Sequence, residues 1–261
     1  MTDLSTDPVV PSGPSVSPML SVRDMVTGYG DLRVVWDVSF DVYPGQVTAL
    51  LGRNGAGKTT TLRAIAGLNK LNGGSVKLDG EDIAGLPAHR RIRAGLGMVQ
   101  ENKRVFKRRS VEVNLMLGAY GRGVSRRKLG GDLAEIYELF PALRDRAKTP
   151  AGQLSGGQQQ MLAIGQTIMG KPKMLMLDEP SAGLAPAIVL EVMESVATLK
   201  RSGLGILLVE QAVEAAVGVA DQVAVLDVGR VVMSGPAGSV DDLAVIRDAY
   251  FGRRPGSDRQ H

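Results

Sequence analysis

A glycine-rich loop between an apolar run and a helical pattern constrains this sequence more than any other feature. The loop reads Gly-Arg-Asn-Gly-Ala-Gly-Lys-Thr-Thr from residue 52, which fits the spacing G-x-x-x-x-G-K-[ST]. Residues 46–51 before it predict a strand, and residues 62–66 after it predict a helix. Glycines let successive backbone N–H groups point at one anion, and the helix start adds its positive dipole end. The loop therefore predicts a phosphate-binding site rather than an empty turn.

The residues of this loop have roles that follow from their chemistry. Lys58 can reach the β- and γ-phosphates of a nucleoside triphosphate, and the Thr59 hydroxyl can bind Mg²⁺. Backbone N–H groups along the loop can hold the phosphates, so the whole segment is a candidate binding site. Its residues are Gly52, Arg53, Asn54, Gly55, Ala56, Gly57, Lys58, Thr59 and Thr60.

A second candidate site lies at residues 174–179, where an apolar run ends in two acids. Such a run predicts a strand buried on both faces of a parallel sheet, and open α/β sheets bind ligands beyond the carboxyl ends of their strands. We expect Asp178 to hold Mg²⁺ and Glu179 to polarise the attacking water. The alternative is an acidic turn before Pro180, which the phosphate loop upstream disfavours.

A third candidate site begins at Ser155, directly before a helical pattern. Ser155 suits the N-cap of that helix, and Gly156 and Gly157 leave backbone N–H groups accessible. With Gln158, these residues predict a second helix start that binds an anion. A Ser-Gly-Gly sequence alone is typical of a flexible loop, but its place between the other two sites favours a function.

Length and composition indicate a globular protein of one large or two small domains. The chain has 261 residues, a net charge of +4 and no cysteine, which excludes a disulfide framework and a thiol nucleophile. Alternating strand and helix patterns predict an α/β fold with a helical insertion at residues 102–170. We expect a disordered tail at residues 1–18, a single domain at 19–252 and a polar tail at 253–261. No apolar run approaches the ~20 residues of a membrane helix.

Local patterns predict further elements outside the three candidate sites. The pattern predicts a short strand at residues 75–78, a mobile linker at 118–131, one helix at 133–143 and a last helix at 240–250. Tyr29 lies between two glycines upstream of the phosphate loop. Its ring either stacks on a purine base or covers an edge of the sheet.

Taken together, the three candidate sites resemble the Walker A, signature and Walker B motifs of ABC-type ATPases, in that chain order. The resemblance covers residues 19–250. It implies a P-loop core with a mixed sheet, an N-terminal antiparallel β-subdomain and an inserted α-helical subdomain. It also implies that ATP and Mg²⁺ bind and that Tyr29 stacks on adenine. Residues 155–158 would then contact ATP held by a second subunit in a head-to-tail dimer.

Within that family, the segments at residues 102–106, 161–165, 178–186, 208–211 and 249–252 resemble the smaller ATPase of branched-chain amino acid importers. This resemblance implies ATP hydrolysis coupled to transport at the cytoplasmic face of the membrane. The implied partners are two permease subunits and, indirectly, an extracytoplasmic solute-binding protein. The second ATPase is either another copy of this chain or a larger sister subunit. Importers of urea, short amides or other small organic solutes share much of the pattern.

Two positions depart from the usual family pattern. Most ABC ATPases carry a histidine where this chain has Gln211, although the branched-chain importer ATPases resemble this chain here. Glutamine differs from histidine in that it cannot become cationic. Because it can still hydrogen-bond the γ-phosphate, we expect Gln211 to act in catalysis beside Lys58 and Glu179. In the loop after residue 99, either Gln100 or Glu101 takes the place of the usual glutamine near Mg²⁺ and the water.

The most basic stretch, residues 103–109, has three interpretations. It contacts the permease or anionic lipid headgroups, or it is a solvated basic face. Nucleic acid is not expected, because Phe106 is the only aromatic residue there. A non-transport ABC ATPase of DNA repair is disfavoured because long heptad insertions are absent, and one of translation because the chain has one cassette. Lys58, Asp178 and Glu179 argue against a purely structural or regulatory nucleotide-binding module.

Overall fold

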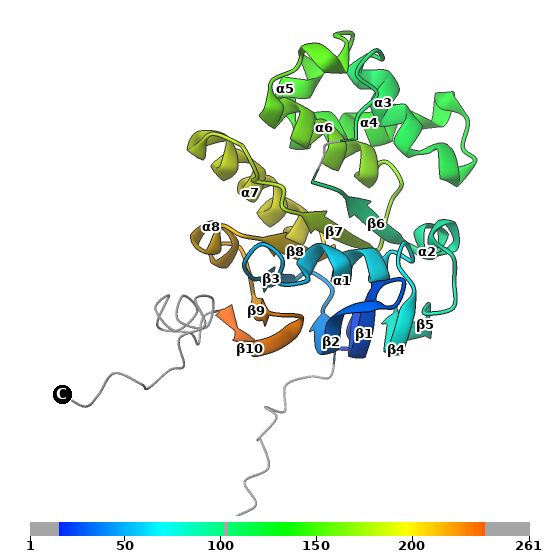
Figure 1. The fold of residues 1–261 in the computed structure, drawn as a ribbon. Coiled ribbons are helices and arrows are strands. Elements are labelled where there is room, and N and C mark those ends of the chain that lie inside the picture. The colour runs from blue at the N-terminus through cyan, green and yellow to red at the C-terminus, as the bar shows by residue number, and fades with distance from the viewer. Residues whose placement is uncertain (1–15, 102–103, 238–261) are drawn as a thin grey trace, which may run out of the picture.

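The computed structural model describes residues 16–101 and 104–237, which form two β-sheets with a group of helices beyond them (Figure 1). The larger sheet is mixed, as predicted, because its last strand runs antiparallel to five parallel ones. In sheet order its strands are β10 (Arg230–Pro236), β9 (Gln222–Asp227), β3 (Val47–Leu51), β8 (Gly205–Glu210), β7 (Met174–Asp178) and β6 (Leu96–Val99).

The smaller sheet is the predicted antiparallel β-subdomain. Its order is β2 (Leu32–Val42), β1 (Leu20–Tyr29), β4 (Leu71–Leu78) and β5 (Glu81–Asp82). The strand predicted at 75–78 begins earlier because Leu71 and Gly73 pair with Thr27 and Val26 of β1. The sequence pattern missed the first half of β4 because that half contains two glycines, which weaken a strand signal.

Both faces of the central strands β3, β7 and β8 are buried, and alternate residues of one strand enter two different cores. Along β7, Met174 and Met176 pack toward the smaller sheet and α1 (Lys58–Ile65), whereas Leu175 and Leu177 pack toward the helices on the other face. This explains why the run reads as continuously apolar. Helix α2 (Ala88–Ala94) leads into β6.

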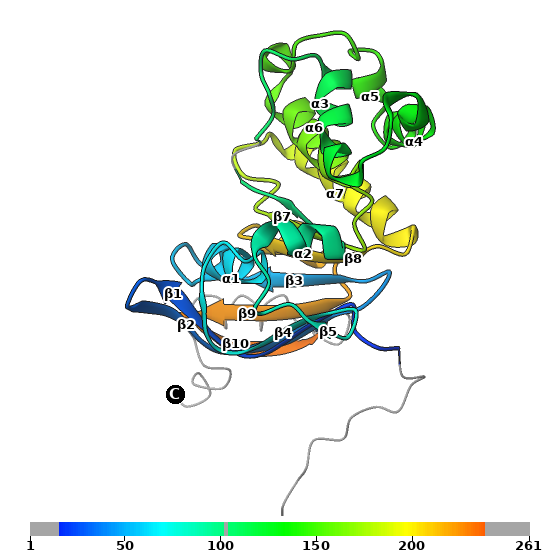
Figure 2. The ribbon, with the colours of Figure 1, turned by 90° about the vertical axis from the view of Figure 1, so that its right-hand side faces the viewer.

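The helical subdomain lies beyond the edge of the larger sheet that is formed by β6, above both sheets in Figure 2. It contains α3 (Val111–Gly118), α4 (Gly130–Leu139), α5 (Pro141–Arg144) and α6 (Gly156–Ile168), with a short 3-10 helix at Ala151–Gln153. Helices α7 (Pro186–Arg201) and α8 (Val213–Val217) return the chain to the sheet. Among the described residues, no helix combines the length and apolar character needed to cross a membrane.

One prediction for this subdomain is wrong, and another missed local structure. The expected helix at 133–143 is two helices, because Pro141 has no N–H to continue α4 and instead begins α5. The expected mobile linker at 118–131 contains two 3-10 helices, Tyr120–Arg122 and Arg126–Leu129. The Arg122 guanidinium holds the first of them, since it donates to the Met169 carbonyl at 2.9 Å and pairs with Asp132. The helix predicted at 240–250, the tail predicted at 253–261 and residues 1–15 of the tail predicted at 1–18 lie outside the described residues; residues 16–18 precede β1 in no helix or strand.

Candidate functional site

The phosphate loop joins β3 to α1 at the carboxyl end of the sheet. Helix α1 has Gly57 as its N-cap, with φ 107° and no side chain capping the helix, so its first N–H groups stay open toward a ligand. Glycine is also required at Gly52, where a Cβ would lie 2.4 Å from the Leu226 carbonyl oxygen. Lys58 is only 4% exposed, and its Nζ donates to the Gly52 carbonyl at 2.6 Å. The loop therefore curls around its own lysine.

The two acids that end β7 meet this loop directly. The Thr59 hydroxyl donates to Asp178 Oδ1 at 3.1 Å, and Lys58 Nζ lies 3.1 Å from Glu179 Oε1. Glu179 has φ 45°, a strained backbone for a residue that is not glycine, which aims its side chain at the loop. Residues 119 positions apart in the chain thus share one site, as the sequence predicted.

Burial raises the pKa of Asp178 to about 6. The Thr59 hydroxyl opposes this shift, while the neighbouring charges of Glu179 and Glu101 add to it and Lys58 again opposes it. The Asp178 carboxyl therefore lies within the influence of two other acids and one lysine. Such an arrangement is stabilised when a cation shares the site, because the cation relieves the repulsion between carboxylates.

Lys58, Thr59 and Glu179 line a cavity of about 370 Å³, here called the P-loop pocket, whereas Asp178 does not. Its lining includes Glu101 but not Gln100, so of these two residues Glu101 is the one that faces the P-loop pocket. Val34 of β2 also lines the pocket, and no sequence signal pointed to it. The full lining is Val34, Arg53, Asn54, Gly55, Gly57, Lys58, Thr59, Thr60, Glu101 and Glu179.

The oxygen atoms of this site suit Mg²⁺ better than a softer metal. Thr59 and Asp178 offer adjacent hydroxyl and carboxylate oxygens, and Glu101 is near. In the part of the chain that the structure describes, no cluster of three or more His, Cys, Asp or Glu could hold a metal by itself. Mg²⁺ does not need one, because it keeps several waters and uses one or two carboxylates together with substrate phosphates.

Two other predicted residues, Tyr29 and Gln211, do not line the pocket. Tyr29 ends β1, is 49% exposed, and its hydroxyl lies 3.4 Å from Thr60 Oγ1. Its ring therefore stands beside the phosphate loop with a solvent-accessible face. Gln211 directly follows β8 and is exposed, and it is not among the residues that line the pocket.

The signature residues lie elsewhere, at the start of α6. The Ser155 hydroxyl accepts from Gln158 N at 3.2 Å and Gln158 Oε1 accepts from Ser155 N at 3.1 Å, which forms a capping box. Ser155 and Gly156 are exposed, and Gly157 is packed so closely that a Cβ would lie 2.2 Å from Ile188 Cγ2. None of these residues lines the P-loop pocket of the same chain.

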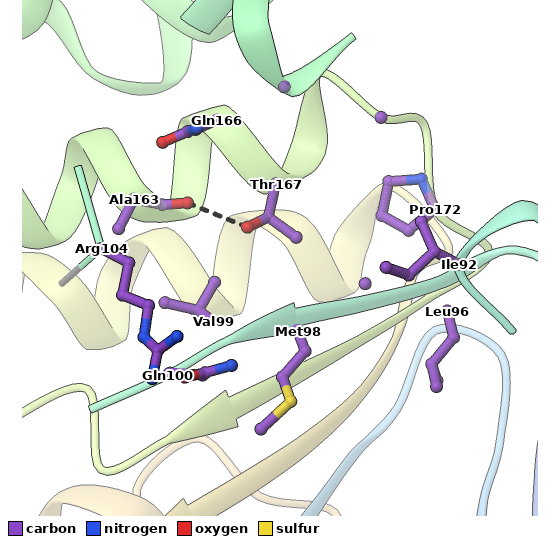
Figure 3. Close-up of a pocket in the computed structure, with 13 residues that line it drawn as sticks. Ile92, Leu96, Met98, Val99, Gln100, Arg104, Ala163, Gln166, Thr167 and Pro172 are labelled. Carbon is purple, nitrogen blue, oxygen red and sulfur yellow. Dashed lines mark hydrogen bonds between the residues drawn. The ribbon is translucent and has the colours of Figure 1, made fainter. Parts of the chain in front are cut away.

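A second cavity, of about 270 Å³, lies between β6 and the helical subdomain and is here called the β6–α6 groove (Figure 3). Gln100 and Arg104 stand at one end of it, and Ile92 and Pro172 at the other. Gln166 and Thr167 of α6 lie above Met98 of β6. Ile92 is 64% exposed, a large apolar surface to leave in water.

Sequence reasoning missed one buried acid beside the site. Glu210 ends β8 and is 1% exposed, with its carboxylate bonded to Ser181 two positions after Glu179. Its signal was available, because it is an acid at the carboxyl end of a buried strand, as Asp178 is.

Comparisons with known proteins agree with the geometry. A family model described as ABC transporter matches residues 35–182. The high-affinity branched-chain amino acid transport ATP-binding protein BraG of Pseudomonas aeruginosa is 41% identical, over 90% of this chain and 100% of BraG. The probable branched-chain amino acid transport ATP-binding protein LivF of Archaeoglobus fulgidus is 37% identical, over 84% of this chain and 92% of LivF.

Two further matches widen the comparison. The lipopolysaccharide export system ATP-binding protein LptB of Escherichia coli is 32% identical, over 89% of this chain and 97% of LptB. Among solved structures, MJ1267, an ATP-binding cassette of an ABC transporter, superimposes with a TM-score of 0.81 at 26% identity. That match covers 90% of this chain and 99% of the cassette, and MJ1267 has also been solved in an ADP conformation.

Proposed function

Because this chain belongs to the ABC transporter family and is an ATP-hydrolysing transporter subunit, we propose that it drives the import of branched-chain amino acids. One observation carries the choice of solute: the 41% identity to BraG extends over the whole length of that protein. The similarity to LivF, at 37%, points the same way. Importers of urea, short amides or other small organic solutes are the alternative within the importers.

In this proposal, hydrolysis begins when the γ-phosphate draws Lys58 away from Glu179. The 3.1 Å ion pair between them supports this order, because a glutamate bonded to lysine is a poor acceptor for a proton from water. Glu179 then polarises the attacking water, and Gln211 donates to the γ-phosphate from the end of β8. Thr59 and Asp178 would hold Mg²⁺, which when bound neutralises charge on the β- and γ-phosphate oxygens. Tyr29 stacks on the adenine.

The working unit in this proposal is a head-to-tail dimer. The exposed start of α6 supports it, because Ser155 and Gly156 are accessible but lie outside the P-loop pocket of their own chain. Each signature segment would close over ATP held by the opposite P-loop. ATP would favour the closed dimer and hydrolysis would release it, so the ATP cycle shifts a two-state equilibrium. The second subunit is another copy of this chain or a larger sister ATPase.

The permease partners are proposed to dock in the β6–α6 groove, at the cytoplasmic face of the membrane. Two features support this site: exposed Ile92 at one end, and Gln100 at the other, one residue from Glu101 of the P-loop pocket. Because Gln100 and Glu101 are adjacent in the chain, a partner bound at Gln100 would respond to nucleotide bound beside Glu101. The Ile92→Asp variant should lose co-purification with the permease subunits while ATP still binds. Retained assembly would contradict the docking site.

Uptake of leucine, isoleucine and valine into proteoliposomes tests the solute. The vesicles should contain this ATPase, its partner ATPase, both permease subunits and a solute-binding protein. ATP-driven uptake, lost in the Glu179→Gln variant, is the expected result. Uptake of urea or an amide instead would select the alternative importers. A permease complex that moves lipopolysaccharide outward would overturn import, which the 32% identity to LptB makes a necessary control.

A further inference from the structure

The carboxylate of Glu210 joins two segments that the proposed reaction needs. One oxygen, Oε1, accepts from the backbone N–H of Ser181 at 2.9 Å. The other, Oε2, accepts from the Ser181 hydroxyl at 2.8 Å and from the backbone N–H of Gln211 at 3.1 Å. Every one of these partners is a donor, so the arrangement requires an acceptor at both oxygens.

The bonded segments carry the two residues assigned to the γ-phosphate end of ATP. Ser181 lies two residues after Glu179, in a turn closed by Ala182 N donating to the Glu179 carbonyl at 3.1 Å. Glu179 N itself donates to the Val209 carbonyl, next to Glu210, at 2.9 Å. The turn is therefore tied to the end of β8 on both sides of Pro180, by the backbone on one side and by a side chain on the other.

Because these groups are buried, the link is rigid, and an N–H, hydroxyl or carboxylate oxygen that lost its partner would cost free energy. Glu210 is 1% exposed and Ser181 is 9% exposed, so water cannot replace a lost bond at either. No lysine or arginine pairs with Glu210 among the described residues; backbone N–H groups and one hydroxyl stabilise it. A buried acid held in this way by neutral donors is expensive to keep, which favours a purpose beyond packing.

We propose that Glu210 is a positioning residue for ATP hydrolysis. Its carboxylate holds the turn that carries Glu179, with the strained φ of 45°, in a fixed position relative to Gln211. The strain at Glu179 persists only because bonds on both sides over-determine the turn. Loss of the link lets the catalytic carboxylate relax away from the attacking water, and the chemical step slows while the P-loop still binds ATP.

This proposal rests on the roles proposed above for Glu179 and Gln211, and its test separates the two levels. If Glu179→Gln retains turnover, the role of Glu179 fails whatever Glu210 does. If Glu179→Gln is inactive, the Glu210 variants then test the link alone. All measurements use the 261-residue chain assembled with its partner subunits.

The Glu210→Gln variant keeps the size of the side chain but sets an NH₂ group against N–H donors. We expect kcat to fall about tenfold, while the Kd for a fluorescent ATP analogue stays within about twofold. Ser181→Ala removes only the hydroxyl partner and should lower kcat about threefold. In Glu210→Gln, adding Ser181→Ala should cause little further loss, because both changes break one link. Multiplying losses would overturn the proposal.

Asp221→Asn is the matched control for a purely structural role. The Asp221 carboxylate also accepts a backbone N–H, from Val47 at 2.8 Å, and pairs with Lys200 at 2.7 Å, but at the opposite end of the sheet. It should lower Tm and leave kcat within about twofold. If Glu210→Gln alters kcat no more than Asp221→Asn does, or weakens ATP binding as much as it lowers kcat, Glu210 only stabilises the fold. Ser181→Ala keeps the test decisive if Glu210→Gln does not fold.

Discussion

The two glycine-rich helix starts of this chain, at α1 and α6, differ in how their first N–H groups are satisfied. Helix α1 has no side-chain cap, and the loop before it closes around the buried amine of Lys58. Helix α6 is capped within its own first turn, by reciprocal bonds between Ser155 and Gln158. The N–H groups of the first start are uncapped inside a pocket, whereas those of the second are capped on an exposed surface.

In the proposed head-to-tail dimer, this contrast would explain why each chain carries both helix starts but completes no ATP site alone. The start of α1 has lysine, hydroxyl and carboxylate groups around a cavity, so ATP can enter it directly. For Ser155 at the start of α6 to bind phosphate, its hydroxyl must turn from Gln158 N, which a serine hydroxyl can do. A capping bond is worth about 0.5–2 kcal/mol, a modest cost beside a charge-assisted bond to phosphate.

The largest expected effect is at the α1 site. Glu179→Gln should lower kcat by about 10²–10⁴-fold, because the amide cannot take up a proton from water. ATP should still bind, and the closed dimer should accumulate because it is no longer released by hydrolysis. Turnover of ATP and gel filtration with ATP measure the two effects. Hydrolysis near the parent rate would remove Glu179 from the reaction.

The α6 start can be tested with a charge placed beside it. Gly156→Asp should lower turnover about 100-fold through repulsion of the phosphate, while ATP binding to the isolated chain is unchanged. Gly121→Asp is the control. Gly121 lies in the same subdomain, and a Cβ added there would meet no atom within 4 Å, so this variant should keep full turnover. Equal losses in the two variants would show that the added charge acts on the subdomain rather than on the phosphate.

Mixing two inactive variants then asks whether the cage is shared between copies. Lys58→Ala damages the phosphate loop and Gly156→Asp damages the signature segment. In a dimer of one copy of each variant, the intact loop of one copy faces the intact signature segment of the other, so one site is intact. Turnover should recover on mixing, to a level set by the single intact site of each mixed dimer. Absence of any recovery would exclude a homodimer of this chain and leave the sister ATPase as the partner.

A smaller effect is expected at Gln211, where the two sites would meet across the γ-phosphate. In Gln211→His the imidazole becomes cationic as the pH falls through about 6.5, which strengthens its contact with the phosphate. The ratio of variant to parent kcat should therefore rise as the pH is lowered from about 8 to about 6, while Gln211→Ala stays low throughout. A ratio independent of pH would place residue 211 away from the γ-phosphate.

The smallest effect concerns the support of the α1 site. Val228 has φ 41° and is 79% exposed, in the turn whose next residue, Gly229, donates to the Ala56 carbonyl of the loop at 2.9 Å. A β-branched residue there is strained by about 1–2 kcal/mol, and asparagine tolerates the conformation better. Val228→Asn should raise Tm by about 2–4 °C, measured by calorimetry. Val232→Asn, on exposed β10, should not raise it; equal gains at both would reject the strain argument.

Much of the fold and site was predictable because the signals are local. The phosphate loop needs glycines and a lysine at fixed spacing, and the apolar run of β7 ends in its acids within a few residues. The extent of β4 was not predictable, since pairing with β1 overrides two glycines. Nor was the structure of residues 118–131, which depends on Arg122 reaching the end of α6.

The sequence by itself determined which chemical groups this protein offers: a glycine loop with a lysine suited to phosphate, acids suited to polarising water, and two helix starts. The tertiary structure decided which groups share one volume. It set Glu101 in the P-loop pocket and Gln100 in the β6–α6 groove, and it tied Glu210 to Ser181. The physical reason is that a motif's spacing fixes its own backbone, whereas the direction of side chains at strand ends depends on neighbours distant in sequence.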